Sequence, residues 1–203
     1  MVARMSADER REKLVDAAIR VMTRDGVAKA TTRAISAEAG MPLGVFHYAF
    51  QSKQELMARV TETIAQRSKA DIDEAVLGND PTENWLAVAL AGLCAYFDHV
   101  VAHPLEHLVT YEITVTALRD PDLREGARRQ FDYYLSENEK LLTAAAELLD
   151  VEYAVPVKVL TRFMFSLMDG LALNWLAKGE EDEAREVVRM AAEYLVSQAR
   201  RRT

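Results

Sequence analysis

Residues 31–50, TTRAISAEAGMPLGVFHYAF, decide the fold of this chain, because they read as a helix, a glycine turn and a second short helix. That order is the layout of a helix-turn-helix that reads DNA. Thr31 can cap the first helix through its hydroxyl oxygen, and Gly40 can take the left-handed conformation that a sharp stop requires. Pro42 suits the first position of the second helix, where a missing N–H costs little.

The second helix is expected to bury one face and to expose the other. Phe46 and Phe50 repeat four residues apart, so they predict the buried side. The opposite face would be free to enter a major groove of DNA. Its outward residues are expected to be Leu43, Gly44, His47 and Tyr48.

The totals favour a helical protein with a sizeable core. The 203 residues allow one large or two small domains, and 50% of them are hydrophobic while only 8 are Gly and 5 are Pro. The single Cys94 excludes an intramolecular disulfide and fits a reducing compartment. We see neither a signal sequence nor an apolar run that approaches the roughly 18 residues of a membrane span. We therefore expect a cytoplasmic protein without a membrane partner.

The net charge of −7 looks unsuitable for a DNA-binding protein until it is divided along the chain. Residues 1–53 carry nine Lys or Arg and six Asp or Glu, whereas residues 54–203 carry sixteen and twenty-six. A basic end on an acidic body would point that end at the duplex, although such an excess is also ordinary surface chemistry.

The pattern of caps and apolar stripes predicts helices throughout, and nothing in the chain reads as a strand. Ser6 to Glu9 has capping-box spacing, and the Asp80-Pro81 pair predicts a cap followed by the first residue of a helix. We expect an all-α fold: a three-helix DNA-binding unit (1–53) followed by a bundle of about six helices for effector binding and dimerisation (54–203). The expected helices include 7–25, 53–77, 105–118, 121–149, 156–179 and 181–199.

With these elements in place, the chain resembles the TetR family of bacterial transcriptional regulators. The resemblance covers residues 14–60 most specifically, through LVDAA (14–18), Asp25-Gly26, TTRAIS (31–36), Ala39-Gly40 and FQSKQEL (50–56). Over residues 56–203 it is one of architecture and length, helped by Asp169-Gly170-Leu171. Members of this family are usually homodimeric repressors that release DNA when a small molecule enters the C-terminal domain.

The resemblance implies that Thr31 and Lys53 touch phosphates and that Arg33 reaches a phosphate or a base edge. The family's aromatic run in the recognition helix is replaced here, because His47 and Ala49 stand where aromatic residues are common. Base reading would then depend on Arg33, on apolar contact with thymine methyls and on DNA shape. The predicted DNA-contacting residues are Thr31, Thr32, Arg33, Pro42, Leu43, Gly44, Val45, His47, Tyr48 and Lys53.

Other site chemistries find little support in the sequence. His99, His103 and His107 have the spacing of metal ligands on one helical face, but Pro104 would bend or end that helix, so we expect no metal site. We find no carboxylate pair, nucleophile triad or glycine-rich phosphate loop. The chain is therefore expected to be neither an enzyme nor the carrier of a cofactor.

A pocket for a mostly apolar effector is expected where the central helices meet. Polar residues set into apolar stripes mark such a pocket, although each could equally be satisfied by another helix or face water. The aromatic candidates are more often core residues. The predicted effector residues are Phe97, His107, Tyr111, Glu112, Phe131, Tyr134, Asn138, Phe163, Leu167 and Asp169.

The last two helices carry more apolar face than a terminal pair needs. The resemblance implies that they pack against the same two helices of a second chain as a four-helix dimer interface. This dimer would place its two helix-turn-helix segments (residues 31–50, here called the reader) on successive turns of one face of the duplex. The alternative is that they only close the core of the monomer. The predicted interface residues are Leu160, Met164, Leu171, Trp175, Val187, Ala191, Tyr194 and Leu195.

We therefore expect a dimeric, ligand-responsive regulator, a repressor released from a palindromic operator by a small molecule. One alternative is a helical small-molecule carrier or enzyme with a vestigial helix-turn-helix, which would bind no DNA. Another is a non-specific architectural DNA protein, which would bind duplexes without a preferred site.

Overall fold

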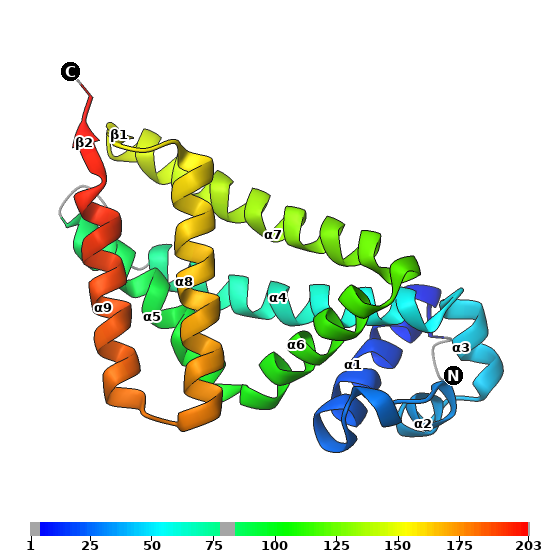
Figure 1. The fold of residues 1–203 in the computed structure, drawn as a ribbon. Helices are drawn as coiled ribbons and strands as arrows, with labels where there is room; N and C mark the ends of the chain where they lie inside the picture. Colours follow the sequence, from blue (N-terminus) through cyan, green and yellow to red (C-terminus); the bar gives the residue numbers. More distant parts are fainter. Residues whose placement is uncertain (1–4, 78–83, 203) are drawn as a thin grey trace. The chain divides into compact units, whose positions relative to one another are not determined.

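The computed structural model describes residues 5–77 and 84–202, and within these ranges the chain is almost entirely helical (Figure 1). The predicted break at Asp80-Pro81 lies outside the described residues. The elements in chain order are α1 (Ala7–Asp25), the 3-10 turn η1 (Val27–Lys29), α2 (Thr32–Glu38), α3 (Leu43–Ala49), α4 (Lys53–Leu77), α5 (Trp85–Ala102), α6 (Pro104–Arg119), α7 (Pro121–Leu148), β1 (Val151–Tyr153), α8 (Val157–Lys178), α9 (Glu181–Ser197) and β2 (Ala199–Arg201).

The described residues form two compact units. Unit 1 holds residues 5–66 and 105–130, and unit 2 holds residues 67–77, 84–104 and 131–202. The chain passes between the units within α4, at the start of α6 and within α7. The predicted boundary between a DNA-binding domain (1–53) and an effector-binding and dimerisation domain (54–203) stays a prediction.

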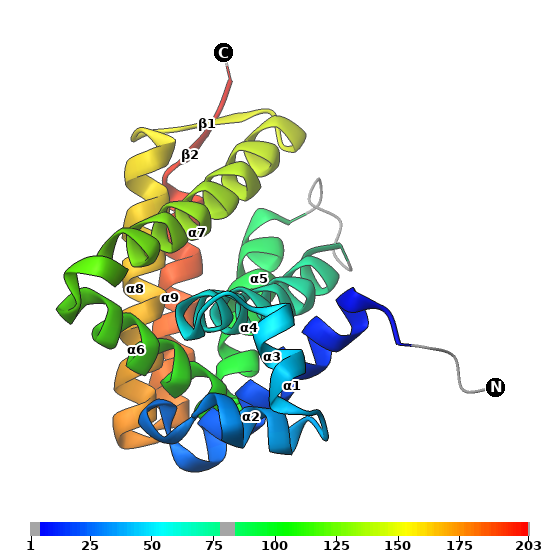
Figure 2. The ribbon, with the colours of Figure 1, turned by 90° about the vertical axis from the view of Figure 1, so that its right-hand side faces the viewer.

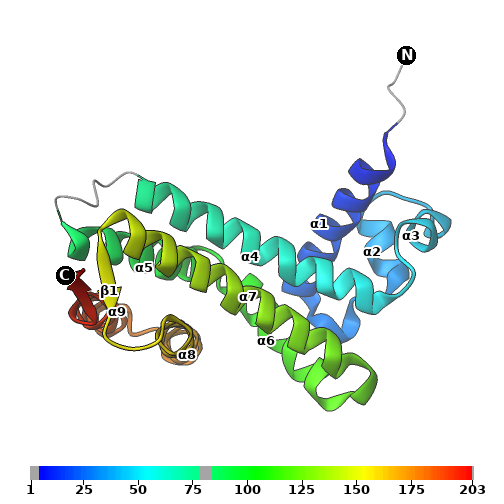
Figure 3. The same cartoon turned by 90° about the horizontal axis from the view of Figure 1, so that it is seen from above.

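Unit 1 is built on α1, whose N-terminus is fixed by the predicted capping box. The Ser6 hydroxyl accepts a hydrogen bond from the Glu9 N–H at 3.1 Å, and the Glu9 carboxylate accepts one from the Ser6 N–H at 2.6 Å. The helices α1, α2 and α3 lie together around a shared core (Figure 3). Its largest fully buried side chains are Leu14, Met22, Ile35, Phe46, Phe50, Leu56 and Ile64, and Val109 and Ile113 from α6 join them.

Unit 2 is built on α5, α8 and α9. The last two helices lie side by side, as Figures 1 and 2 show. Gly179 ends α8 in the left-handed conformation at φ 74°, so that α9 can return along it. The buried core of unit 2 consists of Phe97, Leu160, Met164, Met168, Ala184, Val188 and Ala191.

Two short strands correct the prediction that the chain has none. β1 and β2 pair antiparallel, with Val151 opposite Arg201, and the Ala154 N–H donates to the Gln198 carbonyl at 2.7 Å. Three-residue strands are too short for an alternating pattern to stand out in a sequence. The last helix accordingly ends at Ser197 rather than near 199.

The helix α5 corrects the statement that no apolar run approaches a membrane span. Trp85–Ala102 has 18 residues with a mean hydropathy of 1.6, which suffices by length and composition alone. The core helix of a soluble protein passes the same test; in α5, 17% of this window is buried, where the helix packs against α8 and α9 and buries Phe97 and Val100. Its composition is therefore weak evidence for a membrane.

Candidate nucleic-acid interface and effector region

The turn between α2 and α3 has the predicted chemistry. The Thr31 hydroxyl accepts a hydrogen bond from the Ala34 N–H at 3.1 Å, and Gly40 has φ 65°. Pro42 is the N-cap of α3, with φ −59° and ψ 144°, and Leu43 is the first helical residue. The expectation that Pro42 opens the helix is therefore wrong by one residue.

The outward face of α3 is exposed as predicted. Phe46 and Phe50 are each 1% exposed, whereas Tyr48 is 87% exposed. Leu43, Gly44 and His47 are also exposed. The helix thus presents short and aromatic groups to solvent from a rigid buried base.

Val45 and the first turn of α2 complete the predicted reader. Val45 differs from the outward residues, because it is half-buried and packs against the core of unit 1. In α2, Arg33 is exposed, Thr32 is half-buried and Thr31 is exposed beside them. Arg33 and the face of α3 are therefore the predicted contacts that are most accessible to DNA.

Arg11 of α1 holds the C-terminal end of α3. Its Nη1 donates to the Ala49 carbonyl at 2.6 Å, and its Nη2 pairs with the Glu55 carboxylate. The guanidinium also lies 4.4 Å from the centre of the Phe50 ring. Glu55 accepts a further bond from the Gln51 N–H at 2.8 Å, and these hydrogen bonds lower the pKa of its carboxyl group.

The end of α2 is tied to α1 by a second acidic group. The Glu38 carboxylate accepts hydrogen bonds from Arg20 Nε at 2.9 Å and from Arg24 Nη1 at 3.0 Å. Both bonds lower the pKa of Glu38. Because α2 and α3 are each bonded to α1, the orientation of the reader depends on α1.

Lys53 opens α4 and is half-buried. Its Nζ donates to the Val27 carbonyl at 3.4 Å, and burial lowers the pKa of its ammonium group. An ammonium has three N–H donors, so this bond leaves two for another acceptor. The predicted phosphate contact is compatible with that geometry.

The predicted effector residues do not come together in one unit. His107, Tyr111 and Glu112 lie on α6 in unit 1, and the others lie in unit 2. Glu112 Oε2 accepts a hydrogen bond from the Val27 N–H at 2.9 Å, and His107 is buried. Glu112 thus contacts the turn that precedes α2.

The unit 2 members of that set differ widely in exposure. Phe97 is fully buried and meets Trp175 edge-on at 5.9 Å between ring centres. Asn138 is exposed, and its amide donates to the Tyr134 carbonyl at 2.8 Å. Leu167 packs against the core, and Asp169 lies near the half-buried Tyr96, whose pKa is raised by desolvation and then by that charge.

An aromatic cluster joins α7 to α8. Phe131 lies 6.0 Å from Phe165 between ring centres, and Tyr134 stacks on Phe165 at 6.5 Å. Phe131 keeps 36% of its surface exposed. Aromatic faces of this kind attract apolar rings and cations.

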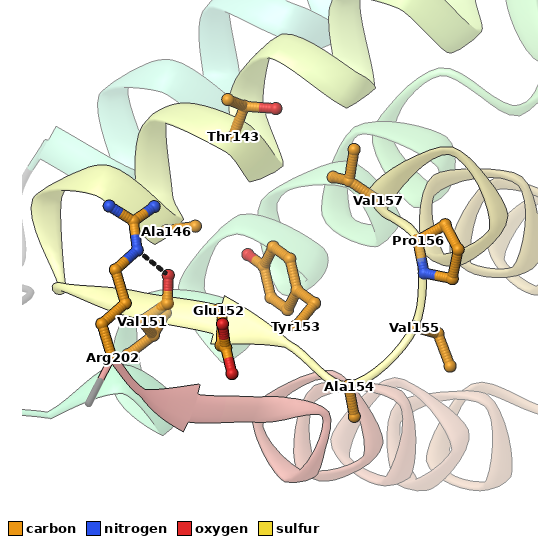
Figure 4. Close-up of a pocket in the computed structure, with 10 residues that line it drawn as sticks. All are labelled: Thr143, Ala146, Val151, Glu152, Tyr153, Ala154, Val155, Pro156, Val157 and Arg202. Carbon is orange, nitrogen blue, oxygen red and sulfur yellow. Dashed lines mark hydrogen bonds between the residues drawn. The ribbon is translucent and has the colours of Figure 1, made fainter.

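A hollow of about 400 Å³ lies beside β1 (Figure 4). Tyr153 lies along it and donates from its hydroxyl to the Leu142 carbonyl at 3.0 Å, and Arg202 Nε donates to the Val151 carbonyl at 3.1 Å. None of the predicted effector residues lines this hollow. Its lining residues are Thr143, Ala146, Val151, Glu152, Tyr153, Ala154, Val155, Pro156, Val157 and Arg202.

The predicted interface residues divide between core and surface. Leu160, Met164 and Ala191 are buried within unit 2, while Leu171, Trp175, Val187 and Leu195 are half-buried and Tyr194 is exposed. Both helices also expose large apolar side chains, and the rings of two of them, Phe163 of α8 and Tyr194 of α9, lie 4.8 Å apart between ring centres. The exposed large apolar residues of these two helices, here called the α8–α9 patch, are Val159, Phe163, Leu173, Met190 and Tyr194.

The three histidines do not gather as ligands. His99 Nδ1 lies 2.6 Å from Asp71 Oδ2, and its ring lies 4.8 Å from that of His103 between ring centres. His107 belongs to the other unit. In the part of the chain that the structure describes, no group of three or more His, Cys, Asp or Glu side chains is placed to hold a metal ion.

Two models of known protein families match most of this chain. Residues 14–60 match the family described as "Bacterial regulatory proteins, tetR family", and residues 86–198 match "Tetracyclin repressor-like, C-terminal domain". The chain belongs to the TetR family. It is a DNA-binding, ligand-responsive transcriptional regulator, and the all-α fold with an N-terminal helix-turn-helix is confirmed.

Individual relatives agree with the family assignment. The chain is 31% identical to the HTH-type nicotine-responsive transcriptional repressor HdnoR of Paenarthrobacter nicotinovorans, over 91% of this chain and 92% of that protein. A TetR-family regulator from Rhodococcus sp. superposes with a TM-score of 0.78 at 20% identity, over 93% and 98% of the two chains. The multidrug binding protein EbrR, solved with imidazole, has a TM-score of 0.64 at 25% identity, over 90% and 89%.

Sequence reasoning missed two groups that support the TetR-family reader. Arg11 and Glu55 hold the end of α3, and Glu38 with its two arginines holds the end of α2. These pairs are separated by 14 to 44 residues in the chain, so no local pattern reports them. The signal available in the sequence was the four arginines of α1, three of which make these bonds.

Proposed function

We propose that this TetR-family protein is a homodimeric repressor that binds a palindromic operator in the cytoplasm and is released by a small, mostly apolar molecule. In this proposal residues 1–53 contact DNA, and residues 54–203 bind the effector and form the dimer. Proteins of the family bind DNA and small effectors and are typically dimers. The observation that carries the proposal is the exposed outward face of α3 on a fully buried base.

The proposed base contacts are Arg33 and the outward residues of α3. Arg33 can donate two parallel bonds to guanine, and Leu43 can pack against a thymine methyl. Tyr48, with 87% of its surface exposed, can reach a phosphate or a base. Thr31 and Lys53 are proposed to contact phosphates and so to fix the register; Thr32, Pro42, Gly44, Val45 and His47 complete the proposed surface.

The α8–α9 patch supports the dimer. Its five residues are each 40% to 58% exposed, and Phe163 and Tyr194 are in ring contact, whereas exposed apolar residues on a monomer surface are normally scattered singly. Phe163 and Tyr194 would form its centre, since aromatic residues dominate interface energies. A twofold axis through this patch would repeat the reader and match a palindrome.

For the effector, the cluster of Phe131, Tyr134 and Phe165 is the proposed contact surface. A relative 31% identical is named a nicotine-responsive repressor, so cyclic amines with an aromatic ring are the first compounds to test. Phe97, His107, Tyr111, Glu112, Asn138, Leu167 and Asp169 stay predictions as effector contacts, whereas Phe163, which the sequence also predicts as one, is proposed to form the dimer instead.

Selection of duplexes from a random pool tests the proposal. We expect the wild-type protein to recover a palindromic duplex. We also expect that cyclic amines which raise the melting temperature of the protein release that duplex. Recovery of no duplex would favour the vestigial reader, and recovery without a shared motif would favour a non-specific DNA protein.

A further inference from the structure

The peptide groups of Val27 are held by two charged side chains from different helices. Glu112 of α6 accepts a hydrogen bond from the Val27 N–H at 2.9 Å, and Lys53 of α4 donates one to the Val27 carbonyl at 3.4 Å. The Val27 side chain is 4% exposed, and Gly26 before it has φ 84°. A backbone position with both polar groups bonded and its side chain buried has little freedom to move.

This turn leads directly into the reader. η1 ends at Lys29, and Thr31 then caps α2, so the position of Val27 fixes where α2 starts. Val109 and Ile113, on either side of Glu112 in sequence, are buried in the same core as α1 and Phe46. The carboxylate of Glu112 is therefore held against the turn by the packing of its own helix.

We propose that Glu112 is a positioning residue for DNA binding, which acts through the Val27 N–H to hold α2 and α3 in their binding orientation. This inference rests on the proposed function, and it gives Glu112 a different role from the effector contact predicted from the sequence.

A role that depends only on the charge of Glu112 and a role that depends on the reach of its side chain predict different effects of substitution on DNA binding. If Glu112 acted only as a negative charge near DNA, removing the charge would tighten binding, because phosphates repel carboxylates. If it acts through its bond to Val27, the carboxylate oxygen must reach the N–H, and the charge matters less. The variants Glu112→Asp and Glu112→Gln separate these cases, since Asp keeps the charge but is one methylene shorter, and Gln keeps an acceptor at the same reach.

The experiment measures binding to the duplex that the wild-type protein selects, by fluorescence anisotropy at fixed salt. We expect E112D to weaken binding about tenfold, within the usual range of coupling between sites, and E112Q to stay within about threefold of the wild type. Exchange of the Val27 amide hydrogen should accelerate in E112D and not in E112Q. The matched controls E125D and E125Q alter an exposed glutamate of α7 in the same unit and should bind within about twofold of the wild type.

Each contrary result has a definite meaning. Wild-type affinity and wild-type Val27 exchange in E112D would overturn the positioning role while leaving the regulator function intact. Tighter binding by E112Q than by E125Q, with E112D unchanged, would show that Glu112 acts only by charge and would also overturn it. Failure of the wild-type protein to select any duplex would overturn the proposed function itself.

Discussion

The outward face of α3 and the α8–α9 patch are both exposed, yet their surroundings differ. α3 is short, and it is held from behind by two buried phenylalanines and by Arg11. The α8–α9 patch lies on long helices and consists of large apolar side chains around Phe163 and Tyr194. A small surface on a fixed base suits a groove in DNA, whereas adjacent apolar side chains suit another protein surface. The comparison predicts that substitutions in the two regions fail in different ways.

The largest effect is expected from a charge in the α8–α9 patch. Phe163→Glu should raise the dimer dissociation constant by about 30-fold or more, because an interface aromatic typically contributes about 2 to 4 kcal/mol. Sedimentation equilibrium measures this, with circular dichroism to check that the variant folds. Tyr133→Glu changes an exposed aromatic of α7 outside the patch and should leave the dimer intact. If F163E were still a dimer, the α8–α9 patch would not be the dimer interface.

The next effect is expected at the reader, without any change of oligomeric state. Arg33→Ala should cost about 1 to 3 kcal/mol on the selected duplex and relax the preference at one base position. Lys53→Ala should weaken binding to all duplexes and reduce the salt slope by about 1, and because it also removes the bond to the Val27 carbonyl, part of the loss should remain at high salt. Titrations of several duplexes at several salt concentrations separate the two. If R33A kept the sequence preference of the wild type, Arg33 would contact a phosphate and not a base.

A smaller effect is expected from the support behind α3. Arg11→Met removes the bond to the Ala49 carbonyl and the pair with Glu55, so unit 1 should lose about 1 kcal/mol of unfolding free energy. Operator binding should weaken more than binding to an unrelated duplex. Arg10→Met, a substitution of the neighbouring arginine, serves as the control. Equal loss on both duplexes would mean that Arg11 does not orient the reader.

The smallest effect concerns pH. The folded-state pKa of Glu55 is lowered by its bonds to Arg11 and Gln51, so its ionised form stabilises the fold above the unfolded value of 4.5. That stabilisation is lost as pH falls through the folded pKa. Glu55→Gln should therefore be less stable than the wild type at pH 7, and the difference should shrink below about pH 4.5. Urea unfolding at pH 7 and pH 4 measures it, and a constant difference would rule out the ionic contribution.

Local chemistry explains which parts of the fold could be predicted. The capping box at Ser6, the Thr31 cap and Gly40 each involve atoms a few residues apart, so the sequence contains all the relevant information. The buried faces of α1 and α3 follow from helical spacing in the same way. Pro42 was misplaced by one residue because a proline fits both the N-cap and the first turn.

Faces of long helices were harder to assign. Leu160 and Phe163 are three residues apart on an apolar helix, yet Leu160 is 1% exposed and Phe163 is 46% exposed. Nothing in such a helix tells which apolar stripe meets the core and which meets a partner. Glu112 posed the same difficulty, because its bond to Val27 joins residues 85 positions apart.

The stoichiometry of the complex with the selected duplex tests the central claim most directly: a reader on α3, doubled by the α8–α9 patch. Sedimentation velocity should show two chains on each palindrome, and inserting about 5 base pairs between the half-sites should abolish the complex, since half a turn moves one site to the opposite face. A single chain on each duplex, with binding that survives the insertion, would contradict it.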